Sequence, residues 1–286
     1  MRYAVVCAFI ASVTMSVGRN LLSKSVSRFS FGTAAFFGVQ TILFISGFAG
    51  LLVPSLINYR GISVMTLVQS LIYAALLITA QWSYTIALGR GNTALCVTVY
   101  SLGFVLPAVS GALFWNEEFT GKNFLGLIFA VLAIVFSKYG KEKSAGKGGF
   151  LPLIISAAAS GGLGIMQKLQ QNSPVSDQKS MFILSAFLLA GCISYISGRL
   201  SHSETEHRLS GREKLCAAVT GICFGCCNLL NTFLAGRLSS AFFFPVQNVS
   251  VIILSLAAGL ILFHERFGKR EAAVVLAGIC AVIMNR

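Results

Sequence analysis

The sequence has very few acidic residues. It contains nine Asp and Glu among 286 residues, and the first of them is Glu117. Charged residues make up only 11% of the chain and hydrophobic residues 56%, whereas a soluble domain carries roughly 25% charged residues. A soluble fold of this size cannot bury so much apolar surface. We therefore expect lipid to be the solvent for most of the chain.

Basic residues outnumber acidic ones, and the formal net charge is +13. The 22 Lys and Arg lie in short groups between apolar runs. They do not form a single basic stripe with interleaved aromatic residues, which would be typical of a nucleic-acid-binding face. Membrane topology and anionic head groups explain their positions. We therefore expect a bilayer, and not a nucleic acid, as the partner.

The eight cysteines show no metal-ligand spacing. The cluster GICFGCCN at 221–228 has neither a second CxxC nor a histidine pair beside it, and a zinc site needs four well-placed ligands. Close packing of small residues between membrane helices is the better interpretation of this cluster. We expect no metal and no other cofactor.

Ten apolar runs follow one another along the chain. A spanning helix needs about 20 residues, and the runs at 3–18, 123–137 and 272–284 are shorter, so flanking Lys and Arg must reach to the head groups. The first run also resembles a signal peptide, but the internal repeat described next requires it as a span. The runs are 3–18, 31–57, 62–88, 93–115, 123–137, 150–167, 181–198, 214–235, 239–263 and 272–284.

The two halves of the chain repeat each other. GRGNTA at 89–94 aligns with GRLSSA at 236–241, and NEEF at 116–119 aligns with HERF at 264–267. This predicts a first five-helix repeat at 1–140, a Lys- and Gly-rich linker at 141–148 and a second repeat at 149–286. Because five is odd, the second copy must cross the membrane in the opposite sense. Inverted repeats of this kind are typical of secondary transporters.

These motifs resemble the drug/metabolite transporter superfamily, and in particular its EamA-like members. The resemblance covers the whole chain. It rests on the repeated short "GR…(S/T)A" turn, followed by a proline-containing helix that ends in a Glu near an aromatic residue. It implies an all-α membrane protein of ten helices in two inverted five-helix repeats. In that family Glu117 and Glu265 would mark hairpins without a catalytic role.

Polar residues inside the spans fall in pairs related by a shift of 147. In the third run, Gln81, Tyr84 and Thr85 share one helical face. Such residues either join helices by hydrogen bonds, at about 0.6 kcal/mol each, or line a hydrated cavity. The number of amides favours a cavity, which predicts these substrate-binding residues: Gln81, Tyr84, Tyr100, Ser101, Asn228, Asn231, Gln247 and Asn248.

Two prolines and several further polar residues accompany this set. Pro107 and Pro245 would free the carbonyl four residues earlier and kink their helices. This either forms a gate or reflects the frequency of proline in membrane helices. Secondary candidates for the lining are Gln40, Arg19, Trp82, Gln167 and Lys168. Arg19 and Lys168 would either attract an anionic group or, as is more common for basic residues at helix ends, anchor the helix at the head groups.

The predicted spans contain no Asp or Glu, and the three histidines lie in loops. A carboxylate-based proton relay is therefore not expected. There is no paired carboxylate and no Ser–His–Asp set. GGLG at 161–164 lies in an apolar helix, where glycine permits close packing, and no strand precedes it as a phosphate loop would require. We expect no enzymatic activity and a neutral or zwitterionic substrate.

The sequence thus predicts a carrier for a small polar metabolite, such as an amino acid, in the cytoplasmic membrane. The alternatives are a flippase for lipid-linked head groups and a non-transporting subunit of a membrane assembly. The loops on one side hold 15 Lys and Arg, against 7 on the side with both termini, which places the termini outside. The family resemblance implies cytoplasmic termini. Direction, coupling ion and oligomeric state stay open.

Overall fold

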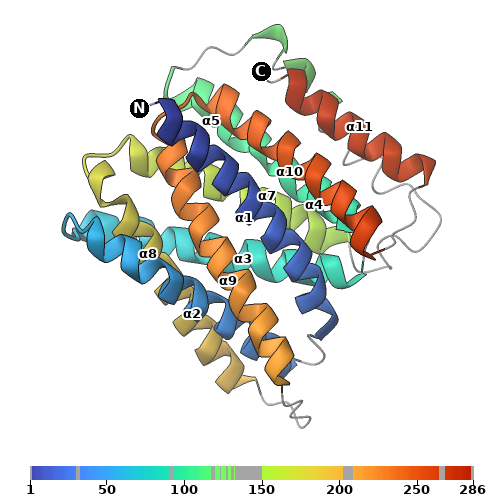
Figure 1. Cartoon of the computed structure of the whole chain (residues 1–286). Helices are drawn as coiled ribbons and strands as arrows, with labels where there is room; N and C mark the ends of the chain where they lie inside the picture. Colours follow the sequence, from blue (N-terminus) through green and yellow to red (C-terminus); the bar gives the residue numbers. More distant parts are fainter. Residues whose placement is uncertain are drawn as a thin grey trace. The chain divides into compact units, whose positions relative to one another are not determined.

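The computed structural model of the chain is helical throughout the part that it describes (Figure 1). The described residues are 2–29, 33–90, 93–116, 120–122, 124–126, 128–129, 132, 150–201, 209–263 and 268–284. The predicted linker at 141–148, most of the fifth predicted run, and both predicted hairpin glutamates, Glu117 and Glu265, lie outside them.

Seven helices in the described part are long and apolar enough to cross a bilayer. They correspond to seven of the predicted runs, so the chain is a helical protein of the kind expected to span a membrane several times. Two further helices, α10 and α11, match the last two predicted runs. The bounds are α1 (Arg2–Phe29), α2 (Thr33–Ile57), α3 (Val64–Arg90), α4 (Thr93–Ser101), η1 (Leu102–Phe104), α5 (Val105–Phe114), α7 (Phe150–Gln171), η2 (Ser176–Gln178), α8 (Lys179–Leu200), α9 (Gly211–Ala235), α10 (Ser240–Phe263) and α11 (Lys269–Met284).

Helix α1 is longer than the sequence predicts. The predicted first run ends at residue 18, but α1 continues through Arg19 and Lys24 to Phe29. Both basic side chains are buried. The interpretation of Arg19 as a head-group anchor at a helix end is therefore wrong. The hydropathy pattern ended the run at the first charge, because it carries no information on burial of that charge by other helices.

The fourth predicted span is broken near Pro107. Helix α4 ends at Ser101, a 3₁₀ turn covers Leu102–Phe104, and α5 starts at Val105. Since proline cannot donate a hydrogen bond to the carbonyl of residue 103, the preceding turn tightens at the predicted place. Helix α10, in contrast, runs from Ser240 through position 245 without interruption.

The chain divides into two compact units. Unit 1 comprises Met1–Ile78 and Leu169–Phe233, and unit 2 comprises Thr79–Lys168 and Leu234–Arg286. Each unit takes segments from both predicted repeats, so the compact units do not coincide with the predicted domains. A repeat defined by symmetry need not be a compact body.

In unit 1, α2 packs antiparallel to α8. Gly198 lies against Phe37 and Gly191 against Ile45, and the hydroxyl of Ser55 donates to the carbonyl oxygen of Ser180 at 3.3 Å. Residue numbers therefore rise along α2 while they fall along α8.

The first half of α3 instead runs parallel to α8. The Thr66 hydroxyl donates to Gln178 Oε1 at 2.5 Å, and one turn further on the Ser70 hydroxyl donates to the carbonyl oxygen of Phe182 at 2.9 Å. Both contacts are 112 residues apart in sequence, so the two helices advance together.

Helix α9 packs parallel to α2 through small residues. A Cβ at Gly221 would overlap the carbonyl oxygen of Leu43, and a Cβ at Gly225 would lie 3.0 Å from the carbonyl oxygen of Gly47. These contacts, again one turn apart, show that the glycines of GICFGCCN allow close helix packing, as predicted.

Unit 2 holds a second close approach, between α7 and the broken helix. A Cβ at Gly103 would overlap the carbonyl oxygen of Ala157, and one at Gly164 would lie 2.8 Å from the Pro107 ring. The GGLG stretch therefore serves packing, as predicted. Helix α10 contacts α4 and α5, and α11 contacts α4 and α10.

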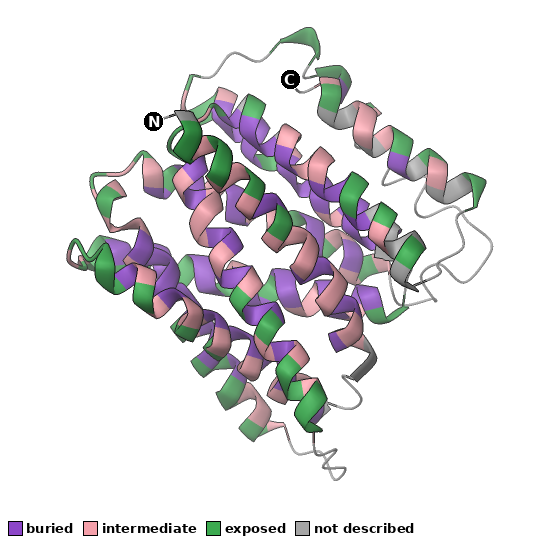
Figure 2. Cartoon of the chain, viewed as in Figure 1, coloured by how far each residue is buried: buried purple, intermediate pink, exposed green. Residues whose placement is uncertain are grey.

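The helices bury many polar residues among their apolar core residues, and they expose many large apolar side chains. On α3 the buried face includes Thr66, Gln69 and Ser70, whereas Val68 and Ile72 are about half exposed, at 53% and 48%. Figure 2 shows the same alternation of buried and exposed stripes on the helices of each unit. A soluble helix exposes mainly polar residues, so these apolar outer faces fit a lipid environment.

Candidate functional site

The eight predicted substrate-binding residues are divided between the two units. Asn228 and Asn231 on α9 belong to unit 1. The other six belong to unit 2: Gln81 and Tyr84 on α3, Tyr100 and Ser101 on α4, and Gln247 and Asn248 on α10. Gln81, Tyr84, Ser101, Asn228 and Gln247 are buried, and the remaining three are partly buried. None of the eight faces outward as a fully exposed side chain.

In unit 1 a row of polar contacts joins α1 to α9. The Ser12 hydroxyl donates to Asn231 Oδ1, and the Ser16 hydroxyl lies 2.9 Å from Cys227 Sγ. These pairs are one turn apart on two antiparallel helices. We name Ser12, Ser16, Cys227 and Asn231 the α1–α9 seam.

Asn228 connects α9 to α3. Its Oδ1 accepts a hydrogen bond from the Tyr73 hydroxyl at 2.6 Å, and its Nδ2 donates to the carbonyl oxygen of Phe224 at 2.7 Å. The Tyr73 ring in turn lies 4.8 Å from that of Phe182 on α8. Asn228 and Asn231 therefore join neighbouring helices by hydrogen bonds. This is the role that was considered as the alternative to lining a hydrated cavity.

Sequence reasoning missed Gln69 on α3. Its side chain is 4% exposed, and neither atom of its amide has a hydrogen-bond partner among the described residues. A buried amide without partners costs about 1–3 kcal/mol, so water or a solute is expected to satisfy it. The shift of 147 pairs Gln69 with Cys216, which is not a large polar residue. The comparison of the two repeats selected pairs of polar residues and therefore did not identify Gln69. Its spacing of four from Tyr73 was the available signal.

A positive charge also lies inside unit 1. Arg19 is 4% exposed, and its guanidinium carbon is 4.4 Å from the centroid of the Phe224 ring. An aromatic face attracts a desolvated guanidinium by about 2 kcal/mol. A basic residue within a membrane-spanning helix is a candidate for function by default.

In unit 2 the predicted residues of α3 and α4 meet. The rings of Tyr84 and Tyr100 have centroids 4.6 Å apart, and Gln81 Nε2 donates to the Thr85 hydroxyl at 3.3 Å. The predicted common face of Gln81, Tyr84 and Thr85 is thus buried as one surface. On α10, Asn248 Nδ2 donates within its own helix to the carbonyl oxygen of Phe244 at 2.7 Å.

The secondary candidates for the lining are also buried or partly buried. Gln40, Gln167 and Lys168 are buried, and Trp82 is partly buried.

Within the described ranges, no group of three or more His, Cys, Asp or Glu side chains is arranged to hold a metal ion.

Comparison with known proteins gives a fold and no function. No family model matches the sequence, and no curated protein matches it. There are 28 matching chains of solved structure. Among them is the crystal structure of a protein that superposes with a TM-score of 0.68 at 13% sequence identity, over 99% of this chain and 96% of that chain. Identity that low shows a shared fold alone.

Proposed function

We propose that the chain is a secondary carrier of the EamA-like type, with ten spans in two inverted five-helix repeats, in the cell's plasma membrane. It moves a small polar solute by alternating access, in which one repeat rocks against the other. The observation that carries the proposal is the set of large polar side chains buried within helices whose outer faces are apolar.

The packing within unit 1 supports an inverted repeat. The predicted repeat makes α8 the equivalent of α2 and α9 the equivalent of α3. A two-fold axis that exchanges α2 with α8 requires these two helices to be antiparallel, as they are. The same axis converts the parallel pair α3–α8 into α9–α2, and that pair is also parallel.

The connections of unit 1 support the count of ten. Gln178 accepts a hydrogen bond from the backbone N–H of Ser63 at 2.9 Å, so the α2–α3 and α7–α8 connections lie at the same end of the unit. An even number of crossings must then separate them. Helix α3, the α4–α5 segment and α7 supply three, and the predicted run at 123–137 supplies the fourth.

The buried polar side chains argue for a solute pathway over simple helix pairing. Asn228 and Asn231 have partners on neighbouring helices, but the amide of Gln69 has none among the described residues. In hydrocarbon an unsatisfied polar group costs several kcal/mol. A hydrated pathway that reaches Gln69 removes this cost.

The charge inside the helices suggests the class of solute. Arg19 is buried in α1, while the described residues of the spans contribute no buried carboxylate. A fixed guanidinium favours a carboxylate on the ligand. Within the predicted range of neutral and zwitterionic solutes, this favours a zwitterion such as an amino acid.

Uptake into proteoliposomes tests the carrier directly. Purified full-length protein is screened with radiolabelled amino acids, nucleobases and sugars, and empty liposomes set the background. For a transported solute we expect Gln69→Met and Gln81→Met to lower kcat/KM about tenfold each, as for the loss of one or two hydrogen bonds. Methionine keeps the length of the side chain and removes its amide.

Ser156→Ala is the matched control, because Ser156 is equally buried but bonds only to the carbonyl of Leu153 in its own helix. It should transport like the wild type. The carrier proposal fails if no solute class exceeds the background. The assignment of the pathway fails if both glutamine variants transport at the wild-type rate.

A further inference from the structure

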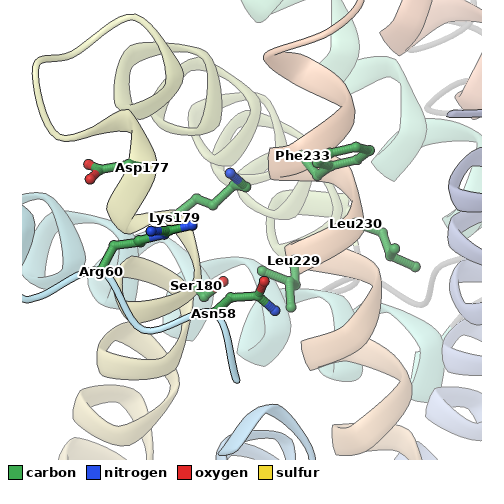
Figure 3. Close-up of a pocket in the computed structure, with 8 residues that line it drawn as sticks. All are labelled: Asn58, Arg60, Asp177, Lys179, Ser180, Leu229, Leu230 and Phe233. Atoms are coloured by element: carbon green, nitrogen blue, oxygen red, sulfur yellow. The ribbon is translucent and has the colours of Figure 1, made fainter. Parts of the chain in front are cut away.

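Unit 1 contains a pocket that none of the predicted site residues lines. It is open to the surface, has a volume of about 640 Å³, and lies at the end of the unit where α2 ends and α8 begins (Figure 3). Three segments form its walls, namely the α2–α3 connection, the start of α8 and the last turns of α9. The lining residues are Asn58, Arg60, Asp177, Lys179, Ser180, Leu229, Leu230 and Phe233.

One wall of the pocket is cationic. Arg60 comes from the α2–α3 connection and Lys179 from the first residue of α8. Figure 3 shows the carboxylate of Asp177 pointing away from both. Among the described residues, no ion pair joins either cation to a carboxylate. Two positive charges that form no ion pair there make this wall a site for an anion.

The start of α8 adds to the positive potential. Its N-cap residue, Gln178, makes no capping hydrogen bond, because its side chain accepts from Ser63 and Thr66 instead. The first N–H groups of this 22-residue helix therefore lack that cap. Uncapped N–H groups and the helix dipole favour an anion at the start of α8, next to Ser180, which also lines the pocket.

The opposite wall is apolar and comes from α9. Leu229, Leu230 and Phe233 line it, and all three are partly exposed. The pocket therefore has a cationic side and a hydrocarbon side. It lies where membrane-spanning helices end, which is the depth of the lipid head groups.

We propose that this pocket binds the phosphate head group of an anionic phospholipid. Arg60 and Lys179 hold the phosphate, the start of α8 and Asn58 provide further hydrogen-bond donors, and the α9 wall packs against the upper acyl chain. A free phosphate shares the head-group chemistry, but it would leave the apolar wall without a ligand. This lipid site is separate from the solute pathway and does not depend on the proposed transport.

Lipid binding is measured on the purified full-length protein in nanodiscs of phosphatidylcholine that contain a small fraction of spin-labelled phosphatidylglycerol. We expect a motionally restricted signal from the protein, at least tenfold stronger per labelled lipid than with labelled phosphatidylcholine. The double variant Arg60→Gln with Lys179→Gln should lose this preference by about tenfold or more, since each basic residue contributes about 1 kcal/mol towards an anionic lipid.

Arg212→Gln with Lys214→Gln is the matched control. It removes the same charge from exposed residues at the other end of α9 and should keep the wild-type preference. Arg60→Lys keeps the charge and should also bind, which separates loss of the site from loss of folding. Soluble glycerol phosphate at millimolar concentration should not displace the lipid.

Three results would overturn the proposal. The first is equal restriction of anionic and neutral lipids by the wild type. The second is an equal loss in the two double variants. The third is displacement by glycerol phosphate, which would assign the pocket to a soluble anion.

Discussion

Single side chains in these helices show two ways of holding a polar group in a membrane. Asn228 and Asn231 are bonded to Tyr73 and Ser12 on neighbouring helices, whereas Gln69 is buried without a partner among the described residues. The first kind holds the helices together, and the second kind needs water or a ligand. The two kinds should respond differently to mutation.

Tyr73→Phe removes only the hydroxyl that donates to Asn228. We expect the free energy of unfolding in detergent to fall by about 0.6–1 kcal/mol, the usual contribution of such a bond between membrane helices. Tyr195→Phe is the control, because the Tyr195 hydroxyl is exposed and bonds only to Arg199 one turn away. If the two variants unfold alike, the α3–α9 bond does not stabilise the unit.

Gly61 offers a test of backbone conformation beside the lipid pocket. Its φ is +89° and a Cβ there would meet nothing within 4 Å, so any cost of Gly61→Ala comes from the backbone alone. We expect a loss of about 1 kcal/mol in unfolding free energy. Gly211→Ala, also in open space but without positive φ, should be neutral. Equal stabilities for the two variants would contradict the assigned conformation.

Among the helices, glycine sets how closely neighbours pack. Gly221 on α9 lies against the backbone of α2, and Gly103 before α5 lies against the backbone of α7. In both places the contacting atom is a carbonyl oxygen, which cannot move aside as a flexible side chain can. Small residues at such crossings are typical of membrane helices.

Gly221→Ala should therefore force α9 away from α2. We expect a loss of about 1–3 kcal/mol in unfolding free energy, as for overpacking of a close contact, measured as a lower midpoint of thermal unfolding in detergent. Gly211→Ala on the same helix is again the control. A midpoint for Gly221→Ala equal to that of the control would show that the α2–α9 distance can relax without cost.

Most of the helices could be predicted from hydropathy alone, because a run of apolar residues is a direct physical requirement of a span. The same reasoning failed at α1, where Arg19 and Lys24 are buried by other helices. The packing role of the glycines in GICFGCCN and GGLG and the break at Pro107 could also be predicted, because each depends on the local residue type. Gln69 and the lipid pocket depend on which helices meet, and no pattern along the chain contains that information.

For the whole molecule, the proposed carrier mechanism requires that one five-helix repeat be inverted relative to the other. The antiparallel pair α2–α8 and the two parallel pairs α3–α8 and α9–α2 are the relations that such a symmetry produces. The inversion needs an odd number of crossings per repeat, and therefore a crossing between α5 and α7. Without this crossing, the α2–α3 and α7–α8 connections would lie on opposite membrane faces, although the hydrogen bond from Ser63 to Gln178 holds them together.

The most direct test locates an epitope tag inserted after Gly121 and, in a second variant, after Gly146. Each tag is detected by antibody in intact and in permeabilised cells, and both variants are checked for membrane insertion. With inverted repeats, the two tags lie on opposite faces of the membrane, and the tag that is accessible in intact cells also decides the orientation of the termini. Tags on the same face would contradict the inverted five-helix repeat and the carrier mechanism built on it.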